Sequence, residues 1–147
     1  MPKHYPTPTK FMPKHPIKYI GDVNNITSRS SWELRFMKWA DSNVNVIKWA
    51  SEEVIIPYHS PVDNRQHRYF TDFAIQVKNK TGELKKYIIE IKPDIQTRMP
   101  NRGKRTTNKY LTELSTYATN QAKWFAADKF CKQRGMEFMI LTEKHLF

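Results

Sequence analysis

The sequence predicts an α/β fold in which helices flank a mixed central sheet. Segments with helical spacing of apolar residues and segments rich in β-branched or aromatic residues follow one another in the order helix, three strands, helix, strand. That order is typical of helices packed on a mixed sheet. The 147 residues are enough to bury one core and too few for two, and 39% of them are hydrophobic. We therefore expect a single globular domain.

The first 18 residues are predicted to form an extended basic arm, followed by the domain at residues 19–147. Each proline fixes φ and removes a backbone donor, which disfavours regular structure. Residues 1–16 contain no acid and no apolar stretch of the kind found in secretory signals. The prolines and lysines concerned are Pro2, Pro6, Pro8, Pro13, Pro16, Lys3, Lys10 and Lys14.

The first helix is predicted to begin after an N-cap at Thr27, Ser28 or Ser30 and to end near Asp41. Glu33 lies three, four and seven positions before apolar residues, which places its carboxylate at the border of the apolar stripe instead of on the solvated face. Four residues with helical spacing are expected to face the core: Trp32, Phe36, Trp39 and Ala40. The other two tryptophans, Trp49 and Trp124, are also expected in the core.

Three extended segments are expected next. Residues 46–49 and 53–58 are rich in β-branched side chains, residues 60–67 are turn-rich, and residues 68–77 alternate as one strand with Asp72 in its middle. Residues 80–83 form a hairpin turn that returns the chain through residues 85–92, most simply as an antiparallel strand. Pro93 ends that strand.

The last third of the chain is predicted to contain a mobile basic loop at residues 94–109, a helix from about 107 to 134 and a closing strand at 137–142. Gly135 supplies the stop of the helix. Its buried stripe is expected to consist of Leu111, Leu114, Ala118, Ala122 and Phe125.

The charge balance favours a polyanionic partner. The chain carries 25 Lys and Arg against 14 Asp and Glu, a formal net charge of +11, so nucleic acid is the first candidate. No apolar run approaches the ~20 residues that span a bilayer, so we expect no membrane insertion. The single cysteine forms no internal disulfide, which fits an intracellular, reducing environment.

The residues that indicate a metal-binding catalytic site are Glu90 and Lys92, with Asp72 on the neighbouring strand. Residues two apart on a strand project from one face, and adjacent strands lie ~4.8 Å apart, so the three side chains can share a small volume. Two ionised carboxylates ~4 Å apart repel by about 4 kcal/mol at an effective dielectric near 20. A divalent cation removes that cost, and hard oxygen ligands without nearby Cys or His favour Mg²⁺, with Mn²⁺ as the alternative, over zinc.

Such a centre suits hydrolysis of a phosphodiester, because a metal stabilises the charge on phosphorus and on the leaving oxygen. Lys92 is expected to position the attacking water and to stabilise negative charge, and Glu33 to complete the metal shell from the helix. A Glu-x-Lys pair on a strand is most often a solvated ion pair. The prediction depends on Asp72 and Glu33 converging on that pair.

Several motifs resemble known nucleases. The "TDF" around Asp72 and the "IIEIKP" around Glu90 resemble the PD-(D/E)xK pattern, whose restriction-endonuclease-like fold has an αβββαβ core. The segments "SRSSWELRFMKWAD", "KWASEEVIIPYHSPVDNRQHRYFTDF", "NQAKWFAADKFC" and "FMILTEKHL" resemble the head completion nucleases of T-even-type tailed phages, which are similar to the endonuclease subunit of heteromeric transposases.

The resemblance covers about residues 19–147 and implies a magnesium-dependent DNA endonuclease of phage head completion, working in the host cytoplasm during assembly or associated with the virion. Asp72 and Glu90 map to the metal-binding acids, Lys92 to the catalytic lysine and Glu33 to the helix acid. The backbone carbonyl of Ile91 is a further expected ligand. The usual proline before the first acid is Thr71 here, which leaves the acid itself intact. Portal or neck proteins are the implied protein partners.

Non-specific contacts to the DNA backbone are expected from exposed basic residues, although charge runs are usually only solvated. The candidates are Arg68, Arg98, Arg102, Lys104, Arg105 and Lys109. Gln121 and Lys123 on the second helix are expected to support the site from outside, with solvent exposure as the alternative. Cleavage of both strands would favour two active sites in a homodimer; the sequence leaves the oligomeric state open.

Two other functions stay open at this point. One is a virion structural protein that binds DNA or the portal without cutting. A pure binder, however, has no reason to keep repulsive acids beside an anionic ligand. The other is a DNA junction resolvase or a transposase-type endonuclease, which shares the chemistry and differs in substrate.

Overall fold

A four-stranded mixed sheet forms the centre of the protein, whose computed structural model describes residues 8–147. Its strands are β3 (Val46–Ser51), β6 (Phe73–Lys78), β7 (Leu84–Ile91) and β8 (Glu137–Leu141), in the order β3-β6-β7-β8. The β3–β6 and β6–β7 pairs are antiparallel and the β7–β8 pair is parallel. The predicted mixed sheet is confirmed.

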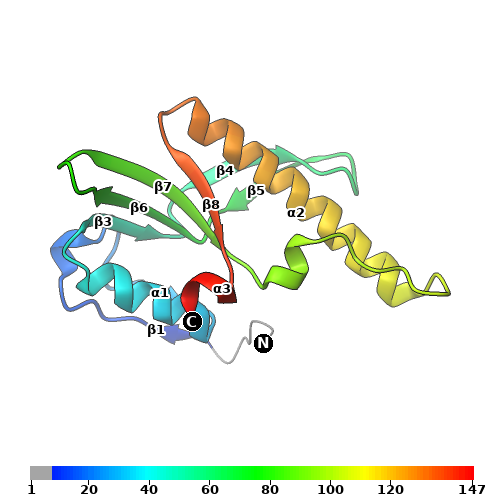
Figure 1. Ribbon diagram of the computed structural model, residues 1–147, viewed down its shortest axis with the longest axis horizontal. Coiled ribbons are helices and arrows are strands. Elements are labelled where there is room, and N and C mark those ends of the chain that lie inside the picture. The colour runs from blue at the N-terminus through cyan, green and yellow to red at the C-terminus, as the bar shows by residue number, and fades with distance from the viewer. Residues whose placement is uncertain (1–7) are drawn as a thin grey trace.

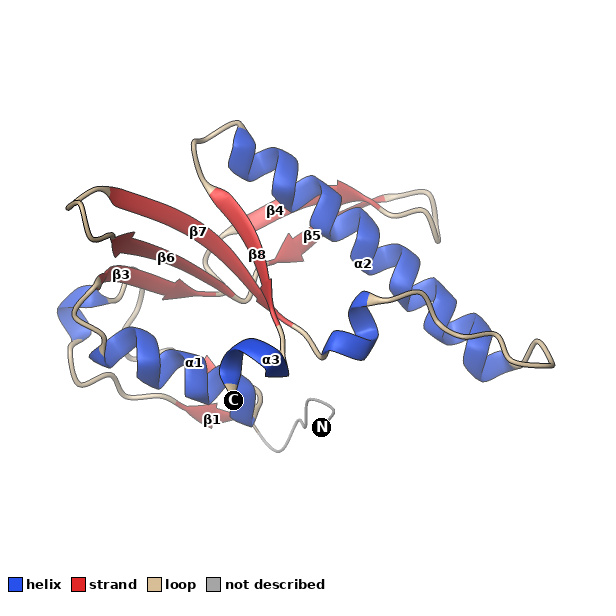
Figure 2. Ribbon diagram, viewed as in Figure 1, coloured by secondary structure: helices blue, strands red, loops and turns tan. Residues whose placement is uncertain are grey.

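Helices cover both faces of this sheet (Figures 1 and 2). The parallel β7–β8 pair needs a crossover connection, which α2 (Asn108–Lys132) supplies on one face. On the other face lie α1 (Ser31–Ser42) and the short C-terminal α3 (Glu143–Leu146). The core is accordingly divided in two, with Phe36 and Ile89 in the α1 cluster and Trp124 and Ala127 in the α2 cluster. No helix among residues 8–147 is long and apolar enough to cross a membrane.

The N-terminal segment differs from the expected extended arm. In residues 8–18, β1 (Thr9–Lys10) pairs with β2 (Thr27–Ser28), and η1 (Pro16–Lys18) is a 3-10 turn. Burial of Phe11, which is 8% exposed, and the amides of Lys14 and His15, which donate to the Asp41 carboxylate, hold this segment on the domain. The prolines disfavour long regular elements, but they do not prevent burial of Phe11 or the hydrogen bonds to Asp41. Residues 1–7, with Lys3 of the predicted arm, lie outside the described residues.

Both ends of α1 are capped by side chains. Of the three predicted N-caps, Ser30 is the one used, and its hydroxyl accepts from the Glu33 amide at 3.2 Å. At the C-terminus, the Lys18 ammonium donates to the carbonyls of Ala40, Asp41 and Asn43 at 2.7, 2.9 and 2.8 Å. A cation on the last carbonyls of a helix also opposes the negative end of its macrodipole.

Replacing Lys18 by methionine is expected to lower the free energy of unfolding by about 1–3 kcal/mol, the usual worth of hydrogen bonds to a charged group. Urea denaturation of wild type and Lys18→Met checks this. Lys38→Met is the matched control, because Lys38 is an exposed lysine within α1, the helix that Lys18 caps. Equal destabilisation by both variants would contradict the capping role.

Residues 68–77 do not form one strand as predicted. β5 (Gln66–Phe70) pairs with β4 (Ile55–His59) in a separate hairpin, and only the following β6 belongs to the central sheet. The break occurs at Thr71, whose amide and hydroxyl both donate to the Val54 carbonyl, at 3.1 and 2.9 Å. Asp72 therefore lies immediately before β6 instead of in mid-strand.

The predicted buried stripe of α2 is wrong for Leu111 and Phe125, whereas Ala122 packs against the α2 cluster as expected. Leu111 and Phe125 are 50% and 75% exposed, and the buried residues are Asn120, Trp124, Ala127 and Cys131. Figure 1 shows that the N-terminal half of α2 projects beyond the sheet, so Leu111 has no core to face, whereas Phe125 lies in the second half and faces solvent. Only the second half packs on the sheet.

The tryptophans follow their prediction with one exception. Trp32, Trp49 and Trp124 are at most 7% exposed, as expected for core residues, whereas Trp39 is 44% exposed. Trp39 lies between the buried Met37 and Ala40 of α1 but borders an apolar hollow, which leaves its ring partly open to solvent.

Candidate active site

Two carboxylates meet at the end of the β6–β7 hairpin. The register pairs Phe73 with Ile89, so Asp72, one residue before β6, lies beside Glu90 on β7. The Asp72 Oδ2 atom accepts a hydrogen bond from the Ile91 amide at 2.8 Å. The structure thus brings Asp72 against the Glu90–Ile91 peptide and presents both acids at one end of the sheet.

Glu90 is held from both of its oxygens. Its side chain is buried, with the residue 6% exposed. Oε2 accepts from the Tyr69 hydroxyl at 2.5 Å, and Oε1 lies 3.5 Å from the Lys92 ammonium. Because the Lys92 side chain is only 18% exposed, this ion pair is largely shielded from solvent. Its shielding from solvent distinguishes this pair from the exposed Glu-x-Lys pair of an ordinary strand.

Tyr69 is the residue of this site that sequence reasoning missed. It is 3% exposed, and burial, together with the negative charges of Glu90 and Asp72, raises its pKa well above the usual range. The phenol therefore stays protonated and acts as a donor to Glu90. The strand break at Thr71 turns Tyr69 toward the acids, whereas unbroken alternation would place Tyr69 and Asp72 on opposite faces.

Glu33 occupies the third residue of α1, where it is 5% exposed. Its carboxylate lies 3.4 Å from the Arg29 amide and 3.5 Å from the Ser30 hydroxyl, so it accepts from the residue before the N-cap and from the N-cap side chain. Arg29 forms a 2.6 Å ion pair with Glu52, whose amide donates to the Asp72 carbonyl at 3.1 Å. Glu33 is therefore linked to Asp72 through a chain of contacts.

The donor set fits a hard cation. Across residues 8–147, no three His, Cys, Asp or Glu side chains are grouped closely enough to hold a metal ion by themselves. The adjacent carboxylates of Asp72 and Glu90 offer oxygen ligands, which suit Mg²⁺ or Mn²⁺, and Mg²⁺ usually binds through one or two carboxylates with water and phosphate in its other positions.

The predicted DNA-binding residues lie on exposed surfaces outside this centre. Arg68 on β5 is exposed, with its guanidinium 5.2 Å from the Phe70 ring centroid. The predicted loop at 94–109 is shorter in the structure, because η2 (Asp94–Thr97) opens it and Thr107 caps α2, which places Lys109 in the helix. Five basic residues are exposed along residues 98–109: Arg98, Arg102, Lys104, Arg105 and Lys109. From here on, the basic arm means this segment and not the N-terminal arm predicted for residues 1–18.

Of the two residues expected to support the site, Lys123 approaches it and Gln121 is exposed. The Lys123 ammonium lies 5.6 Å from the ring centroid of Tyr69 and 5.9 Å from that of Tyr58. Because Tyr69 also donates to Glu90, Lys123 contacts a residue that directly holds the buried carboxylate.

Comparisons with known proteins agree with the fold. Residues 43–143 match the TnsA-like endonuclease N-terminal family. The chain is also 38% identical over 141 residues to the head completion nuclease of Enterobacteria phage T4, which covers 93% of this chain and 91% of that protein. No solved structure matches the chain significantly. The nuclease family predicted from the motifs is confirmed: the chain belongs to the TnsA-like endonucleases.

Proposed function

We propose that this endonuclease is a metal-dependent enzyme that hydrolyses DNA phosphodiester bonds at Asp72, Glu90 and Lys92. The observation that supports this most directly is the buried Glu90 carboxylate, held by Tyr69 and Lys92 next to Asp72. Burying a second acid beside the first is costly in a metal-free protein, because like charges repel strongly away from water. A divalent cation offsets that cost.

Each residue has a role in this proposal. Asp72 and Glu90 would hold Mg²⁺, or Mn²⁺ in its place, together with the Ile91 carbonyl and Glu33, and the cation would stabilise negative charge on the scissile phosphate. Lys92, paired with Glu90 at 3.5 Å, places an ammonium where it orients the attacking water and stabilises developing charge. Tyr69 fixes the rotamer of Glu90 through their hydrogen bond.

The biological role is inferred from the phage relative, whose name is head completion nuclease. We infer that this chain acts in the host cytoplasm at the same stage of phage assembly, after DNA packaging, and meets portal or neck proteins there.

The test is a cleavage assay on supercoiled, nicked, linear and branched DNA, with Mg²⁺, Mn²⁺, Ca²⁺ or a chelator. We expect nicking or linearisation with Mg²⁺ or Mn²⁺ and none with the chelator. Equal cleavage in the chelator would overturn metal dependence. DNA binding without cleavage in any metal would favour the non-catalytic structural protein, and strong preference for branched DNA would favour the resolvase-type enzyme.

The basic arm is expected to bind phosphates without sequence preference. Changing Arg98, Arg102, Lys104 and Arg105 together to Ala should flatten the dependence of log affinity on log salt by about 0.9 for each phosphate that the variant no longer neutralises. Filter binding of a duplex over a series of salt concentrations measures the slope. Lys129→Ala with Lys132→Ala, at the other end of α2, is the control, and unchanged slopes in the arm variant would remove the arm from the interface.

The Tyr69→Phe variant is expected to fold and to cleave roughly 10- to 100-fold more slowly, because removal of a hydrogen bond to a buried charged group costs about 1.5–3 kcal/mol and frees the Glu90 rotamer. Cleavage rates at a series of Mg²⁺ concentrations separate weaker cation binding from slower chemistry. Tyr58→Phe is the control, since Tyr58 is a buried tyrosine of the same hairpin. Equal rates for wild type and Tyr69→Phe would show that the hydroxyl is not needed.

A further inference from the structure

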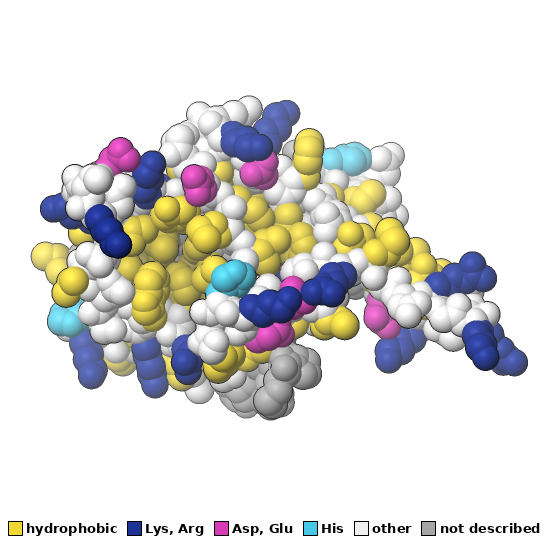
Figure 3. Space-filling view, in the orientation of Figure 1, with side chains coloured by type: hydrophobic (Ala, Val, Ile, Leu, Met, Phe, Trp, Pro, Cys, Tyr) yellow, Lys and Arg dark blue, Asp and Glu magenta, His cyan; other side chains and the backbone are white. Residues whose placement is uncertain are grey.

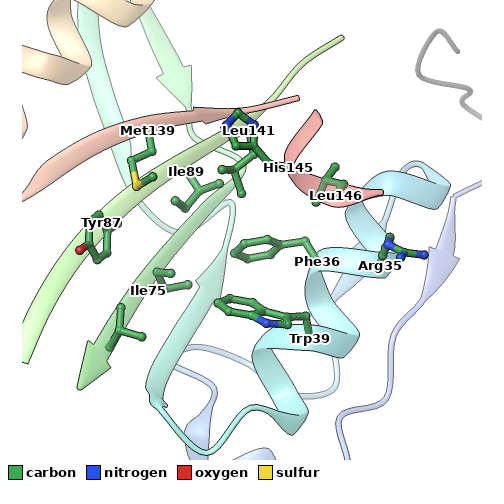
Figure 4. A pocket seen from close by; sticks show the side chains of 11 residues that line it. Arg35, Phe36, Trp39, Ile75, Tyr87, Ile89, Met139, Leu141, His145 and Leu146 are labelled. Atoms are coloured by element: carbon green, nitrogen blue, oxygen red, sulfur yellow. The ribbon is translucent and has the colours of Figure 1, made fainter. Parts of the chain in front are cut away.

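An apolar hollow opens on the sheet face opposite α2. It has a volume of about 520 Å³ and lies between α1, the sheet and α3. Figure 4 shows Phe36 and Trp39 of α1 along one side, with Ile75, Ile89 and Met139 of three successive strands on the sheet side. A 12-residue helix and one short turn are too little to cover four strands, so part of this face stays open.

The apolar side chains of this hollow are accessible. Trp39 is 44% exposed and Met139 39% exposed, whereas Ile89 beneath them is 2% exposed. Figure 3 shows hydrophobic side chains gathered over the sheet between α1 and α3. Contiguous exposed apolar surface on a soluble protein commonly marks a binding site.

The hollow continues into a second one that is basic. The second hollow, of about 390 Å³, shares Trp39, Val77 and Tyr87 with the first. Three lysines line it: Lys78, Lys80 and Lys85. Glu83 pairs with Lys85 at 3.3 Å, which leaves Lys78 and Lys80 as the main positive charges. Among the described residues that line either hollow, none is Asp or Glu. We call the two joined hollows the apolar groove.

The groove lies on the opposite side of β7 from the candidate active site. Side chains alternate along a strand, so Tyr87 and Ile89 face the groove while Glu90 and Lys92 face the α2 side. An occupant of the groove would therefore leave the acids accessible to DNA.

We propose that the apolar groove docks a segment of a partner protein whose apolar anchor residues are flanked by acidic side chains. Most residues that line the apolar part of the groove, such as Ile75, Val77 and Ile89, offer no hydrogen bonds to bases, which disfavours nucleic acid. A second copy is disfavoured by charge, because a two-fold pairing would bring the same basic rim from two chains of net charge +11 together. Acids flanking an apolar anchor complement both parts of the groove.

The first test uses two synthetic amphipathic helical peptides with Leu at every third or fourth position, one flanked by Glu and the other by Lys. Titration calorimetry should show at least tenfold tighter binding of the Glu peptide, and Met139→Glu should weaken that binding at least tenfold. Ile17→Glu is the control, because Ile17 is 82% exposed and lines neither hollow. DNA cleavage should be unchanged in Met139→Glu, which separates this proposal from the nuclease proposal.

The second test reverses the charge of the rim. Lys78→Glu with Lys80→Glu changes two exposed side chains, keeps the apolar part intact and should switch the preference to the Lys peptide. Three outcomes would overturn the proposal. They are equal or absent binding of the two peptides, displacement of the peptide by a single-stranded oligonucleotide, and a dimer in sedimentation that Met139→Glu dissociates.

Discussion

Replacing Glu90 by glutamine is expected to reduce DNA cleavage on the order of 10³-fold, a loss of about 4 kcal/mol of transition-state stabilisation. Glutamine keeps the size of the side chain and still accepts from the Tyr69 hydroxyl, so the fold should survive. It removes the negative charge that holds the cation beside Asp72. Steady-state cleavage of a supercoiled plasmid in Mg²⁺ measures the effect.

Stability gives a readout that does not depend on catalysis. A cation that binds only the folded protein adds about 1.4 kcal/mol of stability at ten times its dissociation constant. Mg²⁺ should therefore raise the melting temperature of wild type and leave Glu90→Gln nearly unchanged.

The control for this experiment is Glu83→Gln. Glu83 precedes β7 and is exposed, so its replacement removes one acid from the same hairpin without touching the buried centre. Cleavage by Glu83→Gln should equal that of wild type. If Glu90→Gln also cleaved at the wild-type rate, the active centre would lie elsewhere in the chain.

The sequence predicted the elements that local pattern determines. The apolar spacing of residues 32–40 predicted α1, and the turn at residues 80–83 predicted the β6–β7 hairpin that brings Asp72 to Glu90. These predictions succeeded because a hairpin turn and a capped amphipathic helix are local structures, whereas the sequence left the register of the hairpin open.

Long-range contacts explain what the sequence did not predict. The strand break at Thr71 depends on its hydrogen bonds to Val54, 17 residues earlier, and no local pattern marks it. Tyr69 was missed for the same reason, since the break decides which way it points. The buried side of α2 was also mispredicted in part, because the exposed Leu111 and Phe125 fit the helical period as well as the buried residues do.

Glu33 has two candidate roles, one at the N-terminus of α1 and one in cation binding. Its place three residues after Ser30 is that of a capping box, which accounts for a glutamate there without any metal. Its contacts through Arg29 and Glu52 to Asp72 bring the same turn of α1 to the end of the sheet that carries the acids. A role in cation binding is compatible with the helix cap, because the cap is the bond from the Glu33 amide to the Ser30 hydroxyl and does not depend on the Glu33 carboxylate.

Replacing Lys92 by methionine is expected to slow cleavage by about 10²–10³-fold while leaving cation binding intact. The ammonium of Lys92 lies 3.5 Å from Glu90 Oε1, so it partly neutralises the carboxylate and competes with a cation for it. Its removal should keep or strengthen the melting-temperature increase caused by Mg²⁺, whereas Glu90→Gln should abolish that increase. Single-turnover cleavage at saturating DNA measures the chemical step alone.

The matched control is Lys86→Met, because Lys86 lies on the same face of β7 but is exposed. It should cleave at the wild-type rate, since any effect through net charge alone would appear equally in both variants. Lys92→Arg keeps the positive charge and changes its shape, so partial activity there would assign Lys92 an electrostatic role. If Lys92→Met lost cation binding and cleavage in parallel, the lysine would only hold Glu90 in place, and the stabilisation of charge would fall to the cation alone.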